Sequence, residues 1–148
     1  MERIYWHTAF FEALKQELSV YGEELEFYNE FSLTMEPLKI DCVVVKKVKD
    51  LIITKNIGEI FRGINIFEYK NPGDYVSVRD YYKVYGYACL YASFRKNDIR
   101  DMTLSFVESR TPRAILKHLN IDRGYTVAEK HPGIYTVIRD VLKLTIKF

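Results

Sequence analysis

The segment PLKIDCVVVKK, residues 37–47, limits the possible folds more than any other part of the chain. Ile40 and the run 42–45 are apolar, so both faces of an extended strand in this segment would be apolar. A strand of this kind is covered on both sides in a folded protein. The segment therefore predicts a central strand in a sheet that has helices on its faces.

Helical and strand patterns alternate along the rest of the chain. Apolar residues recur at spacings of three and four over 6–21, which predicts an amphipathic helix. Ser77 and Asp80 form a capping pair for a second helix that runs to about Phe94, and Thr111 followed by Pro112 begins a third. The predicted strands lie at 25–33, 37–47, 64–70 and 102–109, with two or three more in the tail segments YTVAEK, IYTVI and LKLTIKF.

The order of these elements predicts an α/β fold with a mixed sheet. The first three strands are joined by connections too short for helical crossovers, which favours an antiparallel meander. Within the connection at 48–63, LIIT (51–54) would extend a hairpin and NIGEIFRG (56–63) would form a turn or short helix. The strand that begins at residue 102 follows a helix and could lie parallel to its neighbour.

Length and composition suit a single domain spanning 1–148. The chain has 148 residues, of which 48% are hydrophobic and 28% charged, enough to form a core. Its apolar end, LKLTIKF, would also suit a piece of a longer protein. A formal charge of +2 does not by itself indicate a nucleic-acid binder. Basic residues gather locally, most simply as solvated surface, at KKVK (46–49) with Lys55 and Arg62, and at Arg95, Lys96 and Arg100.

The cysteines and histidines show no metal-ligand spacing. Cys42 and Cys89 suit two thiols in a reducing cytosol, with one disulfide as the alternative. His7 lies near the helical stripe, where we expect it to pack. Neither a signal peptide nor a membrane span is visible, so we expect a cytoplasmic protein without a membrane partner.

Three acidic residues stand where the patterns call for apolar ones. Glu17 falls inside the apolar stripe of the first helix, Asp41 interrupts the central strand, and Glu68 follows NIF in the strand at 64–70. Because residues i and i+2 of a strand share a face, Glu68 and Lys70 lie on the same side. Burial of unpaired charge is costly, so these residues need an explanation.

Asp41 and Glu68 would converge if their strands are neighbours, with Lys70 beside them. Two carboxylates suit Mg²⁺, which prefers oxygen ligands and keeps several waters for a substrate phosphate. A bound Mg²⁺ or Mn²⁺ would lower the pKa of a water and stabilise charge on a phosphoryl oxygen. Lys70 could orient or deprotonate that water, and Glu17 could hold a water on the metal. The set predicts a divalent-metal site with Asp41 and Glu68 as ligands.

This pattern resembles the PD-(D/E)XK nuclease superfamily. Its members have an αβββαβ core with an acidic residue on the second core strand, (D/E)-x-K on the third and often a glutamate on the first helix. Asp41 matches the first position, Glu68-Tyr69-Lys70 matches E-x-K, and Glu17 matches the helical glutamate. Over residues 7–94, the strings PLKIDCVVVKK and NIFEYKNPGDYVSVRDYYKVYGYACLY are similar to uncharacterised bacterial members of this superfamily.

The chain departs from the superfamily pattern at two places. Pro37 lies four residues before Asp41, and Ile40 occupies the adjacent position. Nucleases of the RecB-like branch carry Q-x-x-x-Y on the helix after E-x-K, and here Lys83 and Tyr87 have that spacing with lysine in place of glutamine. The tyrosines of this helix are more simply explained by packing than by stacking on bases.

The resemblance implies a restriction-endonuclease-like fold and a Mg²⁺-dependent phosphodiesterase acting on DNA, with Glu17, Asp41, Glu68 and Lys70 as catalytic residues. Glu30 competes with Glu17 as the fourth carboxylate. Two other interpretations stay open. One is a catalytically inactive module of the same fold that binds nucleic acid or protein. The other is a structural domain in which Lys70 pairs with Asp41 or Glu68.

Overall fold

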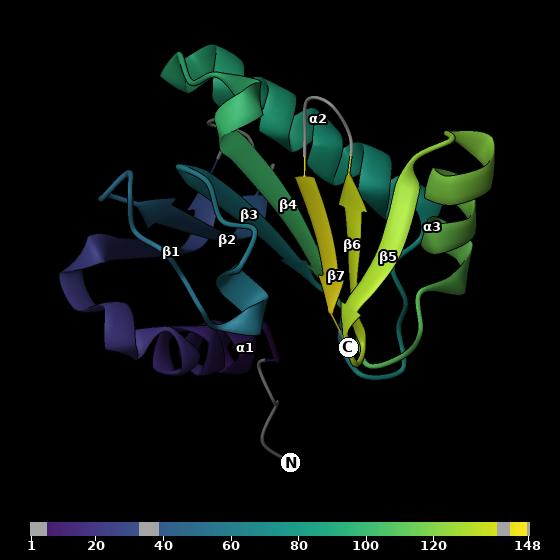
Figure 1. Cartoon of the computed structure of the whole chain (residues 1–148), viewed down its shortest axis with the longest axis horizontal. Helices are drawn as coiled ribbons and strands as arrows, with labels where there is room; N and C mark the ends of the chain where they lie inside the picture. Colours follow the sequence, from purple (N-terminus) through teal and green to yellow (C-terminus); the bar gives the residue numbers. More distant parts are fainter. Residues whose placement is uncertain (1–5, 33–38, 139–142, 148) are drawn as a thin grey trace.

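Strand β2 (Lys39–Lys46) lies inside a sheet, as its apolar sequence predicts. The computed structural model describes residues 6–32, 39–138 and 143–147, and within them seven strands form one sheet in the order β1-β2-β3-β4-β7-β6-β5 (Figure 1). The first residues of the strand expected at 37–47 lie outside the described residues. The other strands are β1 (Leu25–Ser32), β3 (Ile64–Tyr69), β4 (Met102–Val107), β5 (Thr126–His131), β6 (Ile134–Ile138) and β7 (Lys143–Lys147).

The strand directions match the expected meander and the expected parallel return. β1 pairs antiparallel with β2, and β2 pairs antiparallel with β3. β4 lies parallel to β3, and β7 lies parallel to β4. The C-terminal strands β5, β6 and β7 pair antiparallel. The expectation of an α/β fold with a mixed sheet and extra C-terminal strands is confirmed.

Helices cover both faces of the sheet. Ile66 and Phe67 are neighbours on β3 and point to opposite faces. Ile66 packs in one buried cluster with helices α2 and α3, whereas Phe67 packs in a second with α1 (Figure 1). Within the described ranges, no helix has the length and apolar character needed to cross a membrane. The helices are α1 (Trp6–Glu17), α2 (Val78–Arg95) and α3 (Arg113–Lys117), with 3₁₀ turns η1 (Ser19–Glu24), η2 (Asn56–Gly58) and η3 (Ile99–Asp101) and a π turn, η4 (His118–Asp122).

The first helix is shorter than its periodicity predicts. α1 ends at Glu17 rather than near Tyr21, and the turn η1 that follows is kinked at Gly22, whose φ is 53°. A positive φ is easily adopted only by glycine, so the chain can change direction here before β1 begins. The helix therefore stops one turn before the end of its apolar stripe.

Residues 51–54 do not form the expected strand. The backbone N–H groups of Thr54 and Lys55 donate to the hydroxyl of Tyr21, at 2.8 and 3.3 Å, instead of to a neighbouring strand. The turn η2 is the short helix expected within NIGEIFRG. A tyrosine side chain has thus taken the place of a strand partner for this loop.

The capping pair at the start of α2 is confirmed. The backbone N–H of Asp80 donates to the hydroxyl of Ser77, and the backbone N–H of Ser77 donates to the carboxylate of Asp80. This reciprocal arrangement satisfies two backbone donors that the helix itself cannot. It also fixes where the first turn of α2 lies beside the end of β3.

Asn65 ties the start of β3 to the strands on either side. Its side chain is completely buried, and its amide group donates to the carbonyl of Val44 on β2 at 3.1 Å and to that of Arg62 at 2.7 Å. Its amide oxygen accepts from the hydroxyl of Thr103 on β4 at 2.7 Å and from the backbone N–H of Arg62 at 2.9 Å. A buried polar side chain is stable here because all of these groups are paired.

Replacement of Asn65 by alanine should destabilise the protein by about 2–4 kcal/mol, because it leaves several buried donors and acceptors without partners. The matched control is Asn71→Ala in the exposed turn after β3, which should change stability by less than about 0.5 kcal/mol. Urea unfolding of the two variants and the wild type measures the difference. Similar stabilities for the two variants would contradict the role assigned to Asn65.

Candidate active site

Two carboxylates meet where the β2–β3 ladder ends. The last paired residues of this ladder are Cys42 and Phe67. Asp41 directly precedes Cys42 and Glu68 directly follows Phe67, so the two acids flank this last pair. β2 and β3 are neighbouring strands, as the predicted convergence of these two residues requires.

At Asp41, the side chains of strand β2 stop alternating regularly between the two faces of the sheet. Ile40 packs in the buried cluster that includes α2, while Cys42, two positions on, packs in the cluster that includes α1. Residues i and i+2 of a regular strand share a face, so the alternation is broken between them. On β1, Glu30 is the residue in register with Asp41, and its φ of 48° is rare for a residue other than glycine. Because the alternation is interrupted here, the Asp41 side chain does not have to point to the face that a regular strand would give it.

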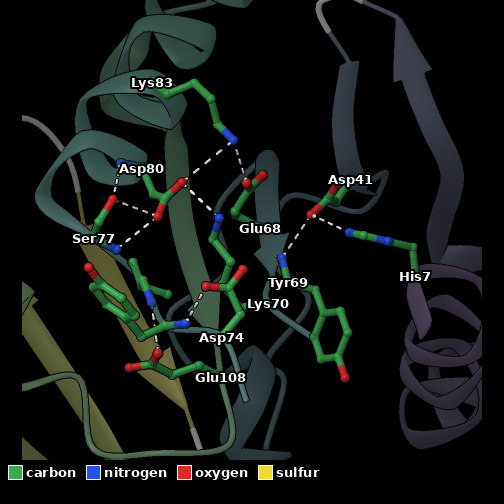
Figure 2. A network of polar contacts seen from close by, with 12 residues as sticks. His7, Asp41, Glu68, Tyr69, Lys70, Asp74, Ser77, Asp80, Lys83 and Glu108 are labelled. Carbon is green, nitrogen blue, oxygen red and sulfur yellow. Dashed lines mark hydrogen bonds and ion pairs between the residues drawn. The ribbon is translucent and has the colours of Figure 1, made fainter. Parts of the chain in front are cut away.

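The Asp41 side chain contacts both β3 and α1. Its Oδ2 accepts a hydrogen bond from the backbone N–H of Tyr69 at 2.9 Å, and Nε2 of His7 lies 3.6 Å from the same oxygen (Figure 2). Tyr69 in turn stacks on Phe10 of α1, with ring centroids 4.9 Å apart. The N-terminal part of α1 is thereby held against the end of β3, next to the carboxylate.

Glu68 is the more deeply buried of the two acids, with a side chain only 7% exposed. Its Oε1 accepts a hydrogen bond from the ammonium group of Lys83 at 2.7 Å (Figure 2). Burial and the nearby charge of Asp41 raise the pKa of Glu68 above its ordinary value, and the bond from Lys83 opposes that rise. The two carboxylates therefore lie within electrostatic reach of each other.

Lys70 pairs with α2 rather than with either of these acids. Its Nζ donates to Oδ1 of Asp80 at 2.8 Å, and Lys83 lies 3.8 Å from the same oxygen. Burial alone would raise the pKa of Asp80, but hydrogen bonds from Lys70 and Ser77 outweigh it, and the pKa is lowered. The charges thus alternate from Lys70 through Asp80 and Lys83 to Glu68 (Figure 2). The alternative in which Lys70 forms a structural ion pair with Asp41 or Glu68 is not borne out, because Lys70 pairs with Asp80.

A further acid, Glu108, follows β4 and contacts the segment before α2. Its Oε2 accepts from the backbone N–H of Val76 at 2.7 Å, next to the cap of α2 (Figure 2). Its Oε1 is buried and has no hydrogen-bond partner among the described residues. Burial raises the pKa of Glu108. Glu108 therefore ties the start of α2 to the sheet.

Glu17 does not reach the two carboxylates. Its side chain is 52% exposed and lies 3.9 Å from Nζ of Lys55. The buried face of α1 contains Phe11 and Leu14, which leaves Glu17 outside it. His7, at the other end of α1, is the residue that contacts Asp41, and ten helical residues separate the two ends by about 15 Å. The rival fourth carboxylate, Glu30, is also exposed and lies 3.8 Å from Nζ of Lys39.

The carboxylate pair offers oxygen ligands of the kind that Mg²⁺ prefers. Oδ2 of Asp41 and Oε1 of Glu68 are held by protein donors, while the second oxygen of each carboxylate accepts no hydrogen bond from the described residues. Those same ranges contain no cluster of three or more histidine, cysteine or acidic side chains able to bind a metal. The residues fit an ion that keeps several waters, not an all-protein cage.

The sequence patterns did not assign four residues of this network to a site. These residues are His7, Asp80, Lys83 and Glu108. Lys83 was indicated only by its spacing from Tyr87, and Asp80 only as a helix cap. No local signal indicates Glu108 or His7, since each contacts the site through the packing of a distant element. Comparison of the chain with protein-family models, with curated proteins and with solved structures found no match.

Replacement of Lys83 by methionine should destabilise the protein at about pH 7 and much less at about pH 4. Without this ammonium group, the pKa of Glu68 rises further above its ordinary value of 4.5, so stability is lost as the pH rises through that range. The loss at neutral pH should be about 1–2 kcal/mol, because solvent screens a lysine that is 40% exposed. Urea unfolding at both pH values measures it.

The control for this prediction is the same substitution in a Glu68→Gln background. With no buried carboxylate left to ionise, Lys83→Met should cost little at either pH. Equal losses in both backgrounds would mean that Lys83 stabilises the fold through contacts other than the one to Glu68, such as its ion pair with Asp80.

Proposed function

We propose that this chain is a divalent-metal-dependent phosphodiesterase of the PD-(D/E)XK type that hydrolyses DNA. One observation carries the proposal. Asp41 and Glu68 flank the last residue pair of the β2–β3 ladder, with Lys70 two residues after Glu68. The order of the first six main elements, α1-β1-β2-β3-α2-β4, agrees with the αβββαβ core of that superfamily. The choice of DNA as substrate rests on the resemblance.

Asp41 and Glu68 would hold Mg²⁺ or Mn²⁺. When bound, such an ion supplies an acidified water and neutralises charge on a phosphoryl oxygen. The protein's part is to hold the two carboxylates at the end of the β2–β3 ladder. The Tyr69 backbone N–H orients Asp41, while Lys83 opposes the raised pKa of Glu68.

Lys70 and Lys83 would have different roles in the reaction. Lys70 occupies the lysine position of E-x-K, where it would orient the attacking water or a phosphate oxygen. Its ammonium group is held in place by Asp80, which the α2 cap fixes in turn. Lys83 stands at the position of the glutamine in Q-x-x-x-Y and would balance the charge of Glu68. Glu17 has no part in this proposed site.

A second candidate function is a catalytically inactive module of the same fold that binds nucleic acid or protein. The observation that favours it is the short bond between Lys83 and Glu68. An ammonium group already neutralises the carboxylate on which a metal ion would depend, as in a structural ion pair. The two functions differ in whether a divalent ion can displace or join Lys83 at Glu68.

Mn²⁺ should bind to the folded wild type, and Asp41→Asn or Glu68→Gln should weaken that binding at least about tenfold, because each variant removes one of two charged oxygen ligands. Titration calorimetry measures the affinities, and circular dichroism checks that each variant is folded. Glu12→Gln, at an exposed position of α1, is the matched control and should bind like the wild type. A folded wild type that binds no Mn²⁺, with or without an oligonucleotide, favours the inactive module.

Lys70→Met should lower the rate of DNA cleavage by about 100-fold or more while leaving Mn²⁺ binding within about twofold of the wild type. The reason is that Lys70 would act on water or phosphate and is not a metal ligand. Cleavage of single- and double-stranded DNA in the presence of Mn²⁺ provides the rates. Glu17→Gln should cleave like the wild type, and a loss of activity there would restore Glu17 to the site.

A further inference from the structure

A basic pocket lies at the opposite end of the β2–β3 pair from the carboxylates. It has a volume of about 720 Å³ and is formed by the end of β2, the loop before β3 and the turn before β4. Five basic side chains line it, against two acidic ones. The basic residues are Lys46, Lys47, Lys49, Arg62 and Arg100, and the acidic residues are Asp98 and Asp101.

The fold brings together basic residues that lie far apart in the sequence. The KKVK run follows β2, Arg62 precedes β3, and Arg100 precedes β4. Because β3 pairs with β2 on one side and with β4 on the other, these three connections meet at one edge of the sheet. What resembles scattered surface charge in the sequence is a single concave site.

Both acids of the pocket are already engaged. Asp98 pairs with Arg100 through a 2.7 Å contact from the guanidinium group to its Oδ2, and it also accepts from the backbone N–H of Arg100. Asp101 accepts from the backbone N–H of Gly63 at 3.2 Å. A Cβ atom on Gly63 would lie 2.2 Å from Oδ2 of Asp101, so a larger residue at this position would displace the Asp101 carboxylate. The carboxylates therefore hold the walls of the pocket in place.

The lysines of the pocket interact less strongly with neighbouring protein groups than its acids do. Lys47 has an exposed ion pair with Glu26 at 3.5 Å, which contributes little in water. In the described part of the chain, Lys49 has no carboxylate within ion-pair distance. Arg62 donates to the carbonyl of Arg100, which fixes one side of its guanidinium group and leaves other donors of the fork. The pocket thus has an excess of positive charge that its own acids do not neutralise.

We propose that this basic pocket binds phosphate groups. Lysine supplies a point charge and arginine a planar fork of donors, the two ways in which proteins bind phosphate oxygens. The volume is in the range of pockets that accept small-molecule ligands. The ligand class is therefore a phosphate-bearing anion, either a free phosphorylated molecule or a segment of a nucleic-acid strand.

This binding site is independent of the proposed metal site. Glu68 lies five residues after Gly63, a distance of about 16 Å along β3. Phosphate binding in the pocket needs no divalent ion, because the charge comes from side chains. Failure of the proposed nuclease function would leave this proposal intact, and the reverse also holds.

The test is calorimetric titration of the full chain with pyrophosphate, in the presence of EDTA so that no metal can recruit the anion to the carboxylates. We expect binding that weakens as salt is raised, because the attraction is electrostatic. The double variant Lys47→Glu/Lys49→Glu should bind at least tenfold more weakly. Lys117→Glu/Lys130→Glu, with both changes at exposed positions outside the pocket, is the control for net charge and should bind within twofold of the wild type. If the first double variant is unfolded by circular dichroism, Lys49→Glu alone takes its place.

Each result has a defined meaning. A folded wild type that does not bind pyrophosphate, or equal loss in the two double variants, overturns the proposal. Specific loss in the pocket variant supports it, and competition by single-stranded DNA then identifies the source of the phosphate. Displacement of pyrophosphate by the strand indicates nucleic acid, and no displacement indicates a free phosphorylated molecule. Asp41→Asn should bind pyrophosphate as the wild type does, which separates this site from the metal site.

Discussion

Strands β2 and β3 are covered on both faces, and this double burial decides where polar side chains can stand. From Ile64 to Glu68 every residue of β3 is buried, because α2 packs over one face and α1 over the other. Inside such a strand a polar side chain is stable only when its polar groups have hydrogen-bond partners, as those of Asn65 do. The remaining polar groups gather at the two ends of the strand pair. Asp41 and Glu68 lie at one end with lysines beside them, and the basic pocket lies at the other.

The acidic end depends on the placement of helix α2. A buried carboxylate on β3 needs a cation nearby, and Lys83 supplies it from the second turn of α2. The cap formed by Ser77 and Asp80 fixes the start of that helix, and Asp80 also holds Lys70. The same short segment therefore satisfies the helix terminus and balances charge at the site. Because these contacts balance the charge, a pair of acids can persist beside an apolar core whether the site is catalytic or structural.

The two ends of β3 differ in the chemistry that they offer. Asp41 and Glu68 present anionic oxygens, suited to a divalent cation, whereas Lys49, Arg62 and their neighbours present cationic donors, suited to phosphate. Each end also contains charges of the other sign, Lys83 beside Glu68 and Asp98 beside Arg100. A protein that acts on phosphodiesters has use for both metal ligands and phosphate-binding groups. The contacts that form one end are separate from those that form the other.

Sequence by itself determined the order of the main elements, the antiparallel meander and the cap of α2, because each follows from a period of two or 3.6 residues or from a short turn. It did not determine that α1 stops at Glu17, where a kink at Gly22 and the packing of Phe11 leave that carboxylate in solvent. Only the tertiary structure decided which cation pairs with Glu68, that His7 contacts Asp41, and that distant basic residues share one pocket. Such pairings depend on how elements far apart in the chain pack against one another, and no local periodicity encodes that.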